Sequence, residues 1–228
     1  MPSPMRQVWN NLAERFDEEL FPTLYAAASL STADIDRATR KRFGTEPAAA
    51  LVKLEPRLIA GGQTLVVADG EGRNSTFLAG QGYGVQATDY SEVGLAKARK
   101  LATRMGVSVD YQLQNIFDVD WTAQQFDNVV AVFIQFVPPD AMRSVLSGLA
   151  SALRPGGVLL LHGYTPEQLD LGTGGPPQRE HMYTAGLLHE VYQDLSIEVC
   201  EEYRAEISEG RGHRGVSALI DFVGRKAA

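Results

Sequence analysis

One stretch of sequence decides the fold: Thr64-Leu65-Val66-Val67-Ala68-Asp69-Gly70-Glu71-Gly72-Arg73-Asn74-Ser75. Residues 65–68 are apolar, which suits a strand covered on both faces. Gly70 and Gly72 let the backbone approach a ligand where a Cβ atom would clash. A helix that begins near Arg73 offers unpaired N–H groups to a ligand carboxylate or ribose oxygen. The stretch therefore predicts a strand, a tight turn and a helix that cradle a nucleotide cofactor, and indicates an enzyme.

A second unit follows directly along the chain. Residues 84–90 are expected to form a strand that ends in Asp89, at about the 20-residue spacing that ribose-binding acids keep from a glycine turn. Ser91 is expected to cap a helix through Arg104. A solvated loop carboxylate is the alternative for Asp89. Dinucleotides and S-adenosylmethionine both fit such a unit, and Ser75 occupies the place of the third small residue of a dinucleotide site.

Alternating strands and helices predict an α/β protein with a doubly wound sheet. We expect a mostly parallel, seven-stranded sheet whose last strand is antiparallel, because a turn-rich connector at 208–215 predicts a terminal hairpin. A helix is expected to end within 149–154, and another to reach residue 59. The chain of 228 residues is interpreted as one domain, 1–228, with a helical cap and covering loop at 1–47 and the core at 48–228. The expected strands are 64–68, 83–88, 107–112, 127–134, 157–163, 196–207 and 215–224.

This order of elements resembles class I S-adenosylmethionine-dependent methyltransferases, in which the turn Leu153-Arg154-Pro155-Gly156-Gly157 before an apolar strand is frequent. Four motifs resemble more closely the small bacterial tellurite-resistance-type methyltransferases, over roughly residues 43–226. The resemblance implies a Rossmann-like fold and methyl transfer from S-adenosylmethionine, giving S-adenosylhomocysteine, to a small-molecule acceptor such as an anionic, thiol or chalcogen-type nucleophile. The motifs are Gly70-Glu71-Gly72-Arg73-Asn74, Asp89-Tyr90-Ser91, Tyr164-Thr165-Pro166-Glu167-Gln168-Leu169 and Gly174-Gly175-Pro176.

The cofactor site is expected at the carboxyl ends of the parallel strands. Asp89 is expected to bind the ribose and Tyr90 to lie beside the adenine, whose amino group Asn115 would meet. Arg73 is expected to pair with the methionine carboxylate. A plain turn role for Asn115, a surface position for Gln135 and a solvated Arg73 remain alternatives. The full set of expected cofactor residues is Asp69, Gly70, Glu71, Gly72, Arg73, Asn74, Asp89, Tyr90, Asn115, Ile116, Phe133 and Gln135.

The acceptor site is expected in the segments added to the fold. Guanidinium groups bind oxyanions bidentately, so a cluster of arginines there would form an anion pocket. A histidine near neutral pKa could take a proton from a thiol or hydroxyl acceptor, although His162 fits equally a satisfied core histidine. The substrate candidates are Trp9, Tyr25, Arg179, Tyr183, Arg211 and Arg214, and the catalytic candidates are His162, His181, His213 and Tyr164.

Charge and composition exclude other classes. A net charge of −7, with no Lys/Arg run longer than residues 40–42, argues against nucleic acid as a partner. The sequence has no run of 18 apolar residues that would predict a membrane span, and no signal peptide is visible, so a cytoplasmic location is expected. A monomer or homodimer is expected. The single cysteine forms no internal disulfide, and no metal site is expected. A sensor that binds S-adenosylmethionine without transfer, or a nicotinamide-dependent reductase, are the alternative functions.

Overall fold

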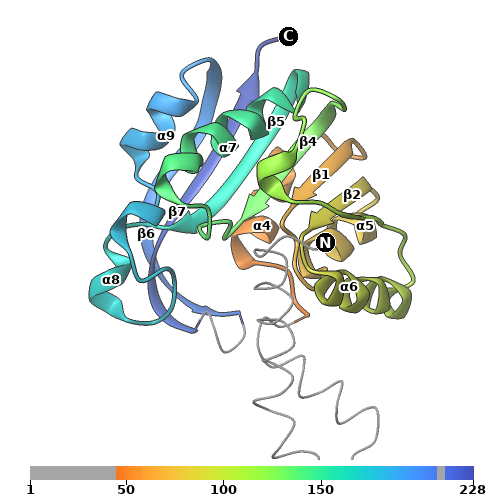
Figure 1. Cartoon of the computed structure of the whole chain (residues 1–228), viewed down its shortest axis with the longest axis horizontal. Coiled ribbons are helices and arrows are strands. Elements are labelled where there is room, and N and C mark those ends of the chain that lie inside the picture. The colour runs from red at the N-terminus through yellow and green to blue at the C-terminus, as the bar shows by residue number, and fades with distance from the viewer. Residues whose placement is uncertain (1–44, 210–213) are drawn as a thin grey trace, which may run out of the picture.

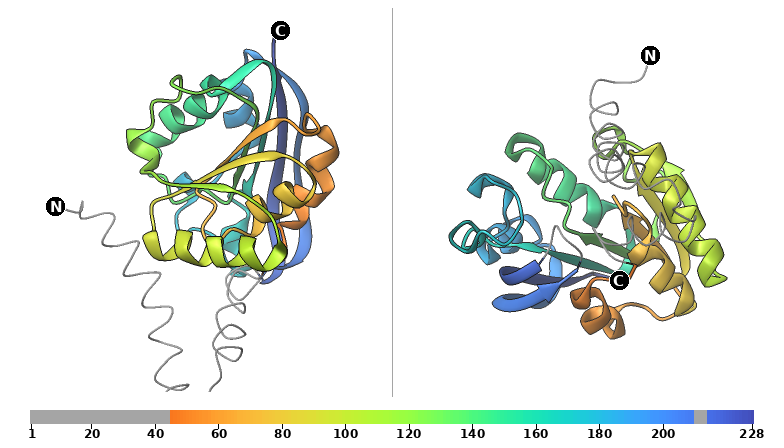
Figure 2. Two further views of the ribbon diagram at one scale, coloured as in Figure 1. Left: turned by 90° about the vertical axis from the view of Figure 1, so that its right-hand side faces the viewer. Right: turned by 90° about the horizontal axis from the view of Figure 1, so that it is seen from below.

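The computed structural model describes residues 45–209 and 214–228, which form one seven-stranded sheet with helices on both faces (Figures 1 and 2). Residues 1–44 of the expected cap lie outside this description. The strand order across the sheet is β3-β2-β1-β4-β5-β7-β6. The strands are β1 (Gln63–Val67), β2 (Gly84–Asp89), β3 (Asp110–Leu113), β4 (Phe126–Val132), β5 (Leu153–Tyr164), β6 (Leu195–Ser208) and β7 (Arg214–Lys226).

The sheet has the mixed topology expected from the sequence. Strands β1 to β5 are parallel to one another. Strand β7 lies between β5 and β6 and runs antiparallel to both, so the terminal hairpin inserts its second strand into the sheet and leaves its first at the edge. The prediction of a mostly parallel sheet with an antiparallel last strand is confirmed.

Two helical layers cover the sheet. Val66, Val130 and Leu160 pack towards α4, α5 and α6 on one face, while Leu65, Val129 and Leu159 pack towards α7 and α9 on the other. Burial on both faces explains why the central strands are nearly continuous apolar runs. The α-helices are α4 (Ala49–Leu54), α5 (Arg73–Gly80), α6 (Glu92–Met105), α7 (Pro139–Ser151), α8 (Gln168–Leu171) and α9 (Ala185–Val191), and the short 3₁₀ helices are η1 (Glu55–Arg57), η2 (Ile116–Asp118) and η3 (Arg179–His181).

Several predicted boundaries were wrong by a few residues. Strand β3 starts at Asp110 rather than at 107, because α6 ends on the left-handed Gly106 and a connection follows. Helix α7 ends at Ser151, within the expected range of 149–154, but β5 starts at Leu153 rather than at 157, since Leu153 already pairs with Phe126. Helix α4 ends at Leu54, and only a 3₁₀ turn continues to Arg57. None of the helices within 45–209 and 214–228 has the length and apolar character that crossing a bilayer requires.

A buried carboxylate joins α4 to the antiparallel end of the sheet. The Oδ1 atom of Asp221 lies 2.8 Å from Nδ1 of His162 and accepts a hydrogen bond from Oη of Tyr203 at 3.0 Å. Its Oδ2 atom accepts from Nζ of Lys53 at 3.0 Å. Burial alone would raise the pKa of Asp221, but hydrogen bonds from His162 and Lys53 hold this pKa below its ordinary value. Asp221 therefore contributes to stability in its ionised form.

Asp221→Asn should lower the free energy of unfolding by about 3 kcal/mol near pH 7, because His162 and Lys53 lose a buried anionic partner. Because the folded-state pKa is lowered, this contribution is fully present above the unfolded carboxyl pKa, about pH 4, and is lost as the pH falls through the folded-state value. Urea unfolding at pH 7 and pH 3 should show that the difference in free energy of unfolding between wild type and variant is smaller at pH 3.

Glu190→Gln is the matched control, since it removes the exposed ion pair with Arg143 at 2.9 Å and should change stability little. Equal loss of stability in the two variants would show that the Asp221 network does not stabilise the fold.

Candidate functional site

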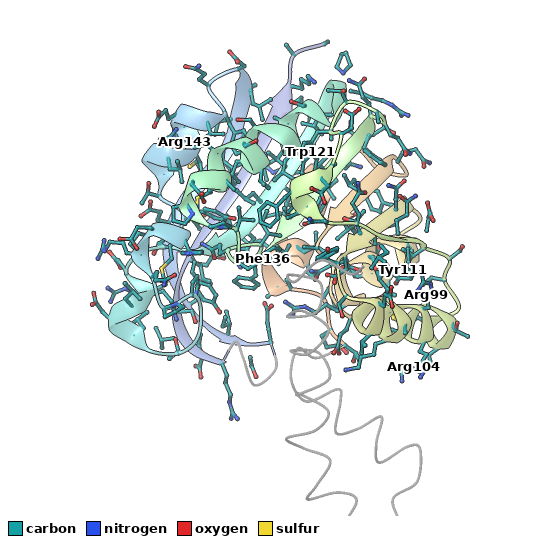
Figure 3. The ribbon with its side chains drawn as sticks, viewed as in Figure 1. Arg99, Arg104, Tyr111, Trp121, Phe136 and Arg143 are labelled. Carbon is teal, nitrogen blue, oxygen red and sulfur yellow. The ribbon has the colours of Figure 1, made fainter. Side chains whose placement is uncertain are left out.

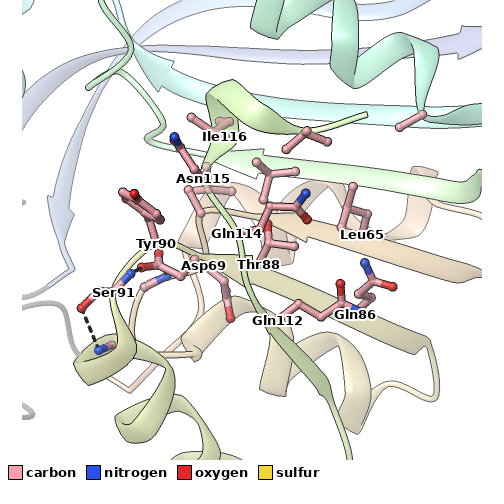
Figure 4. A pocket seen from close by; sticks show the side chains of 18 of the residues that line it. Leu65, Asp69, Gln86, Thr88, Tyr90, Ser91, Gln112, Gln114, Asn115 and Ile116 are labelled. Carbon is pink, nitrogen blue, oxygen red and sulfur yellow. Dashed lines mark hydrogen bonds between the residues drawn. The ribbon is translucent and has the colours of Figure 1, made fainter. Parts of the chain in front are cut away.

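A cavity of about 640 Å³ opens at the carboxyl ends of β1, β2 and β4 (Figure 4). Its size is typical of small-molecule sites, and the carboxyl edge of an open parallel sheet is where such ligands bind. The cavity walls come from the β1–α5 turn, the β2–α6 turn, the connection after β3 and the end of β4. The residues that carry the argument below are Asp69, Gly70, Glu71, Arg73, Asn74, Asp89, Tyr90, Asn115, Ile116, Phe133 and Phe136.

Asp69 follows β1 and is 8% exposed. Its backbone N–H donates to the carbonyl of Thr88, which extends the pairing of β1 with β2. Its Oδ1 atom accepts from the backbone N–H of Ser75 at 3.2 Å. Its Oδ2 atom is buried and has no hydrogen-bond partner among the described residues. Burial raises the pKa of Asp69 to about 7, against the hydrogen bonds from Ser75. One oxygen of this carboxylate is thus available to a ligand.

The two glycines of the turn have different roles. Gly70 has φ +64°, and a Cβ atom added there would meet nothing within 4 Å, which is consistent with open cavity space. Gly72 has φ +91°, and its added Cβ atom would lie 2.7 Å from Cβ of Ala98 in α6. Gly72 does not line the cavity. The close approach that Gly72 permits in this structure is that of α5 to α6, and its role towards a ligand stays a prediction.

Asp89 ends β2 and also lines the cavity. Its Oδ2 atom accepts from the N–H of Gly70 at 2.9 Å and its Oδ1 atom from the N–H of Ser91 at 2.8 Å. Burial raises the pKa of Asp89 despite these bonds. The alternative of a solvated loop carboxylate does not hold. Ser91 caps α6 as expected, because its Oγ atom accepts from the N–H of Gly94 at 3.0 Å (Figure 4).

Asn115 and Gln135 both bind the protein's own backbone. The Oδ1 atom of Asn115 accepts from the N–H of Phe117 at 3.3 Å and its Nδ2 atom donates to Asp118 at 2.8 Å. The turn role left open for Asn115 is therefore present, although this side chain also lines the cavity beside Ile116. The alternative of a surface position for Gln135 does not hold, and its contact with the cofactor stays a prediction. Its amide is buried, lies off the cavity and pairs with the backbone of Tyr164 at 2.6 and 2.8 Å.

Arg73, Asn74 and Glu71 line the cavity at the start of α5. Arg73 is buried rather than solvated, and its NH1 atom lies 2.9 Å from Oε2 of Glu209. Asn74 accepts a hydrogen bond from the N–H of Ala48 at 3.0 Å. Glu71 pairs with Lys97 at 3.1 Å. These contacts tie the turn to α4, α6 and the end of β6.

The predicted acceptor residues do not converge on the cavity. Trp9, Tyr25, Arg211 and His213 lie outside the described residues. None of the remaining six candidates is among the described residues that line the cavity: His162, Tyr164, Arg179, His181, Tyr183 and Arg214.

The structure assigns most of these six to the protein interior or to the surface. Tyr183 is 1% exposed and packs in the core, away from the residues that line the cavity. His162 is the satisfied core histidine, held by Asp221. Burial raises the pKa of Tyr164, whose ring packs on Phe133 at 4.8 Å. Arg179 and Arg214 are exposed. Loop side chains of this kind cannot be placed from sequence, because their partners are distant in the chain.

One wall of the cavity consists of residues that were not predicted from the sequence. Gln86, Gln112 and Gln114 point into it from β2 and the end of β3 (Figure 4), and Trp121 and Phe136 complete it (Figure 3). A visible signal was the alternation of polar residues along strands β2 and β3, which indicates a sheet face that no helix covers. Only the short η2 lies between β3 and β4.

On the opposite face of the sheet, Tyr111 of β3 packs towards α6. The Arg99 guanidinium lies 5.9 Å from the ring centre of Tyr111 and donates to its carbonyl at 3.1 Å (Figure 3). Ser75 lies 3.1 Å from the Tyr111 hydroxyl. Ser75 occupies the position where a dinucleotide site requires close helix–strand contact, and here its side chain forms a hydrogen bond with Tyr111.

Charge in the cavity is predominantly acidic. Among the described lining residues the carboxylates are Asp69, Glu71, Asp89 and Asp120, and the one cation is Arg73. An excess of carboxylates in a low-dielectric cavity wall favours a ligand that carries positive charge.

Comparison with known families identifies the domain. A family model described as a methyltransferase domain matches residues 65–157, which include the glycine turn, Asp89 and β4. This chain contains a methyltransferase domain. The prediction of a class I methyltransferase, made from the order of elements, is confirmed by this match and by the fold. No curated protein sequence matches the chain.

Solved structures share the fold of this methyltransferase. A protein described with the conversion of a disulfide bond into a thioacetal group during echinomycin biosynthesis has a TM-score of 0.67 at 21% identity, over 80% of this chain and 82% of its own. TehB from Haemophilus influenzae has a TM-score of 0.63 at 19% identity, over 78% of this chain and 61% of its own. A SAM-dependent methyltransferase from Methanosarcina mazei has a TM-score of 0.62 at 17% identity, over 77% and 97%.

Gly72→Ala should destabilise the methyltransferase by about 2–4 kcal/mol, because the methyl group overlaps Ala98 and the residue keeps a left-handed φ. Gly70→Ala is the matched control, since its φ is also left-handed but its methyl group meets nothing within 4 Å, so about 1 kcal/mol is expected. Chemical denaturation of both variants measures the difference. Equal losses would show that the α5–α6 contact tolerates a side chain.

Proposed function

We propose that this methyltransferase binds S-adenosylmethionine in the cavity and transfers its methyl group to a small-molecule acceptor, leaving S-adenosylhomocysteine. The observation that carries the proposal is the buried Oδ2 atom of Asp69, which faces no partner among the described residues in an acidic cavity at the end of β1. S-adenosylmethionine presents a protonated amino group and a sulfonium, and both cations suit such a site. Solved structures of this fold hold the same cofactor or its product.

Each part of the cofactor has a matching group in the cavity. Asp69 would accept a hydrogen bond from the ammonium group, and Asp89, which keeps free lone pairs, would accept from the ribose hydroxyls. Tyr90 and Ile116 would flank the adenine. Arg73 would bind the carboxylate.

At the other end of the cavity, Phe133 and Phe136 would form an apolar wall beside the transferable methyl group. Phe133 has a left-handed φ of 55°, a strained conformation of the kind that clusters at functional sites.

The chemistry asks little of the protein beyond orientation. The sulfonium supplies an activated leaving group when the cofactor is bound. The cavity walls hold the reactants in line and keep water away, which is the main contribution available to such a reaction. No histidine is among the described residues that line the cavity. The described lining therefore offers no imidazole to take a proton from the acceptor.

We infer that the acceptor is a soft nucleophile such as a thiol or a heavier chalcogen species. The acidic lining disfavours a large oxyanion, and the aromatic residues Phe133, Phe136 and Trp121 provide a polarisable surface. The structural neighbour described with disulfide-to-thioacetal conversion, together with TehB, supports this choice at the level of fold.

Asp69→Asn should weaken binding of S-adenosylmethionine by about tenfold or more, because a charge-assisted hydrogen bond to the ammonium group is lost. Calorimetric titration with S-adenosylmethionine, S-adenosylhomocysteine and NAD measures this. Asp120→Asn is the control, since Asp120 also lines the cavity but is exposed and bonds to Thr122. Binding of NAD alone, or an unchanged affinity in Asp69→Asn, would contradict the proposal.

Affinity for S-adenosylmethionine should rise with pH across neutrality. The pKa of Asp69 is about 7 in the absence of ligand, and only the ionised carboxylate attracts the ammonium group. The ionised fraction, and with it this part of the affinity, increases about tenfold from pH 6 to pH 8. Asp69→Asn serves as the control because it retains the titration of the ligand itself. Parallel pH profiles for wild type and variant would show that Asp69 does not meet the ammonium group.

The acceptor class can be tested by homocysteine release from S-adenosylhomocysteine in a coupled assay. Small thiols and hydrogen sulfide should be methylated faster than carboxylates or phenols of similar size, because the acidic lining disfavours anionic carboxylates and the aromatic lining suits a polarisable sulfur. Preferential turnover of oxyanions would overturn the assignment of a soft acceptor while leaving methyl transfer intact.

A further inference from the structure

Arg73 and Glu209 form a buried ion pair that joins the cofactor helix to the end of the sheet hairpin. Arg73 is the first residue of α5, and Glu209 follows the last residue of β6. Their side chains are 9% and 8% exposed, and NH1 of Arg73 lies 2.9 Å from Oε2 of Glu209. Neither of these two atoms makes a hydrogen bond of good geometry with a described residue. The contact is therefore electrostatic and leaves hydrogen-bonding capacity unused on both sides.

The two partners are held differently. Glu209 is anchored away from the cavity, because its Oε1 atom accepts from the N–H of Ala49 at 2.9 Å. Asn74, next to Arg73, accepts from the N–H of Ala48 at 3.0 Å. Arg73 lines the cavity, whereas Glu209 does not. Glu209 thus lies outside the cavity lining, whereas Arg73, whose guanidinium has five N–H donors, belongs to it.

We propose that Glu209 is the resident counter-ion of Arg73 and lowers the affinity of the site for the carboxylate of the cofactor. This inference rests on the proposed function. A buried guanidinium without an anion is costly, and Glu209 balances the charge of Arg73 when no ligand is bound. When a ligand carboxylate binds the same guanidinium, two carboxylates share one cation and repel each other at short range. Glu209 therefore weakens binding of the amino-acid end of cofactor and product, and leaves binding of the adenosine end unaffected.

The same carboxylate also reaches α4. Since Glu209 binds both Arg73 and the N–H of Ala49, a ligand that competes for Arg73 acts on the group that fastens the start of α4. Occupation of the carboxylate subsite and attachment of α4 are thus linked through one side chain.

The test compares two ligands that differ only in the carboxylate: S-adenosylmethionine and decarboxylated S-adenosylmethionine. In Glu209→Gln the amide oxygen can still accept from Ala49, but the negative charge is gone. Calorimetry should show S-adenosylmethionine bound on the order of tenfold more tightly than by wild type, because a like charge has been removed from the subsite. Affinity for the decarboxylated ligand should stay within about twofold of the wild-type value, because this ligand has no carboxylate for Glu209 to repel.

A second variant keeps the inference testable if Glu209→Gln folds poorly. Arg73→Gln should abolish the difference in affinity between S-adenosylmethionine and its decarboxylated form. Adding Glu209→Gln to this variant should change neither affinity further. Glu167→Gln is the control for charge alone, since it removes the exposed ion pair with Arg204 at 2.9 Å. It should leave both affinities unchanged.

Three results would overturn the inference. The first two are an affinity of Glu209→Gln for S-adenosylmethionine that equals that of wild type and one that is lower. The third is an equal change in the affinities for both ligands, which would show that Glu209 has a purely structural role. If wild type binds S-adenosylmethionine and the ratio of the two affinities does not respond to Glu209→Gln, this inference fails and the proposed function stands. If wild type binds neither ligand, both fail together.

Discussion

The site depends on a single buried carboxylate, that of Asp69, held between a strand and a helix. Asp69 continues the pairing of β1 with β2 and binds the N–H of Ser75 inside α5, so it fixes where the helix starts relative to the sheet. The residue before it, Ala68, has a left-handed φ of 51°. Burying a carboxylate with one unpaired oxygen is unfavourable unless a ligand completes its bonds. The strained turn and the unpaired oxygen together indicate a site that is preorganised for a cation.

The packing of α5 against α6 maintains this geometry. Gly72 brings the backbone of α5 close enough to Ala98 that any side chain would overlap it. Asp89 then bonds to the N–H of Gly70 and to that of Ser91, which joins the turns after β1 and β2. The two acids and two turns form one rigid unit at the carboxyl edge of the sheet, in which a change at one position alters the other.

Sequence reasoning succeeded where the signal is local. The strand, glycine turn and helix at 63–80, the acid that ends β2 and the Ser91 cap all follow from short-range patterns, and the structure has each of them. It says less about residues whose surroundings depend on distant partners. Gln135 looked polar and available but pairs with the backbone of Tyr164, and Tyr183 packs into the core. Glu209 drew no attention, since its partners Arg73 and Ala49 lie more than a hundred residues away in sequence.

A crystal structure with S-adenosylhomocysteine bound tests the central claim most directly. We expect the amino group of the ligand within hydrogen-bond distance of Oδ2 of Asp69, the ribose hydroxyls beside Asp89 and the adenine between Tyr90 and Ile116. A ligand bound elsewhere, or in this cavity with its amino group directed away from Asp69, would contradict the account.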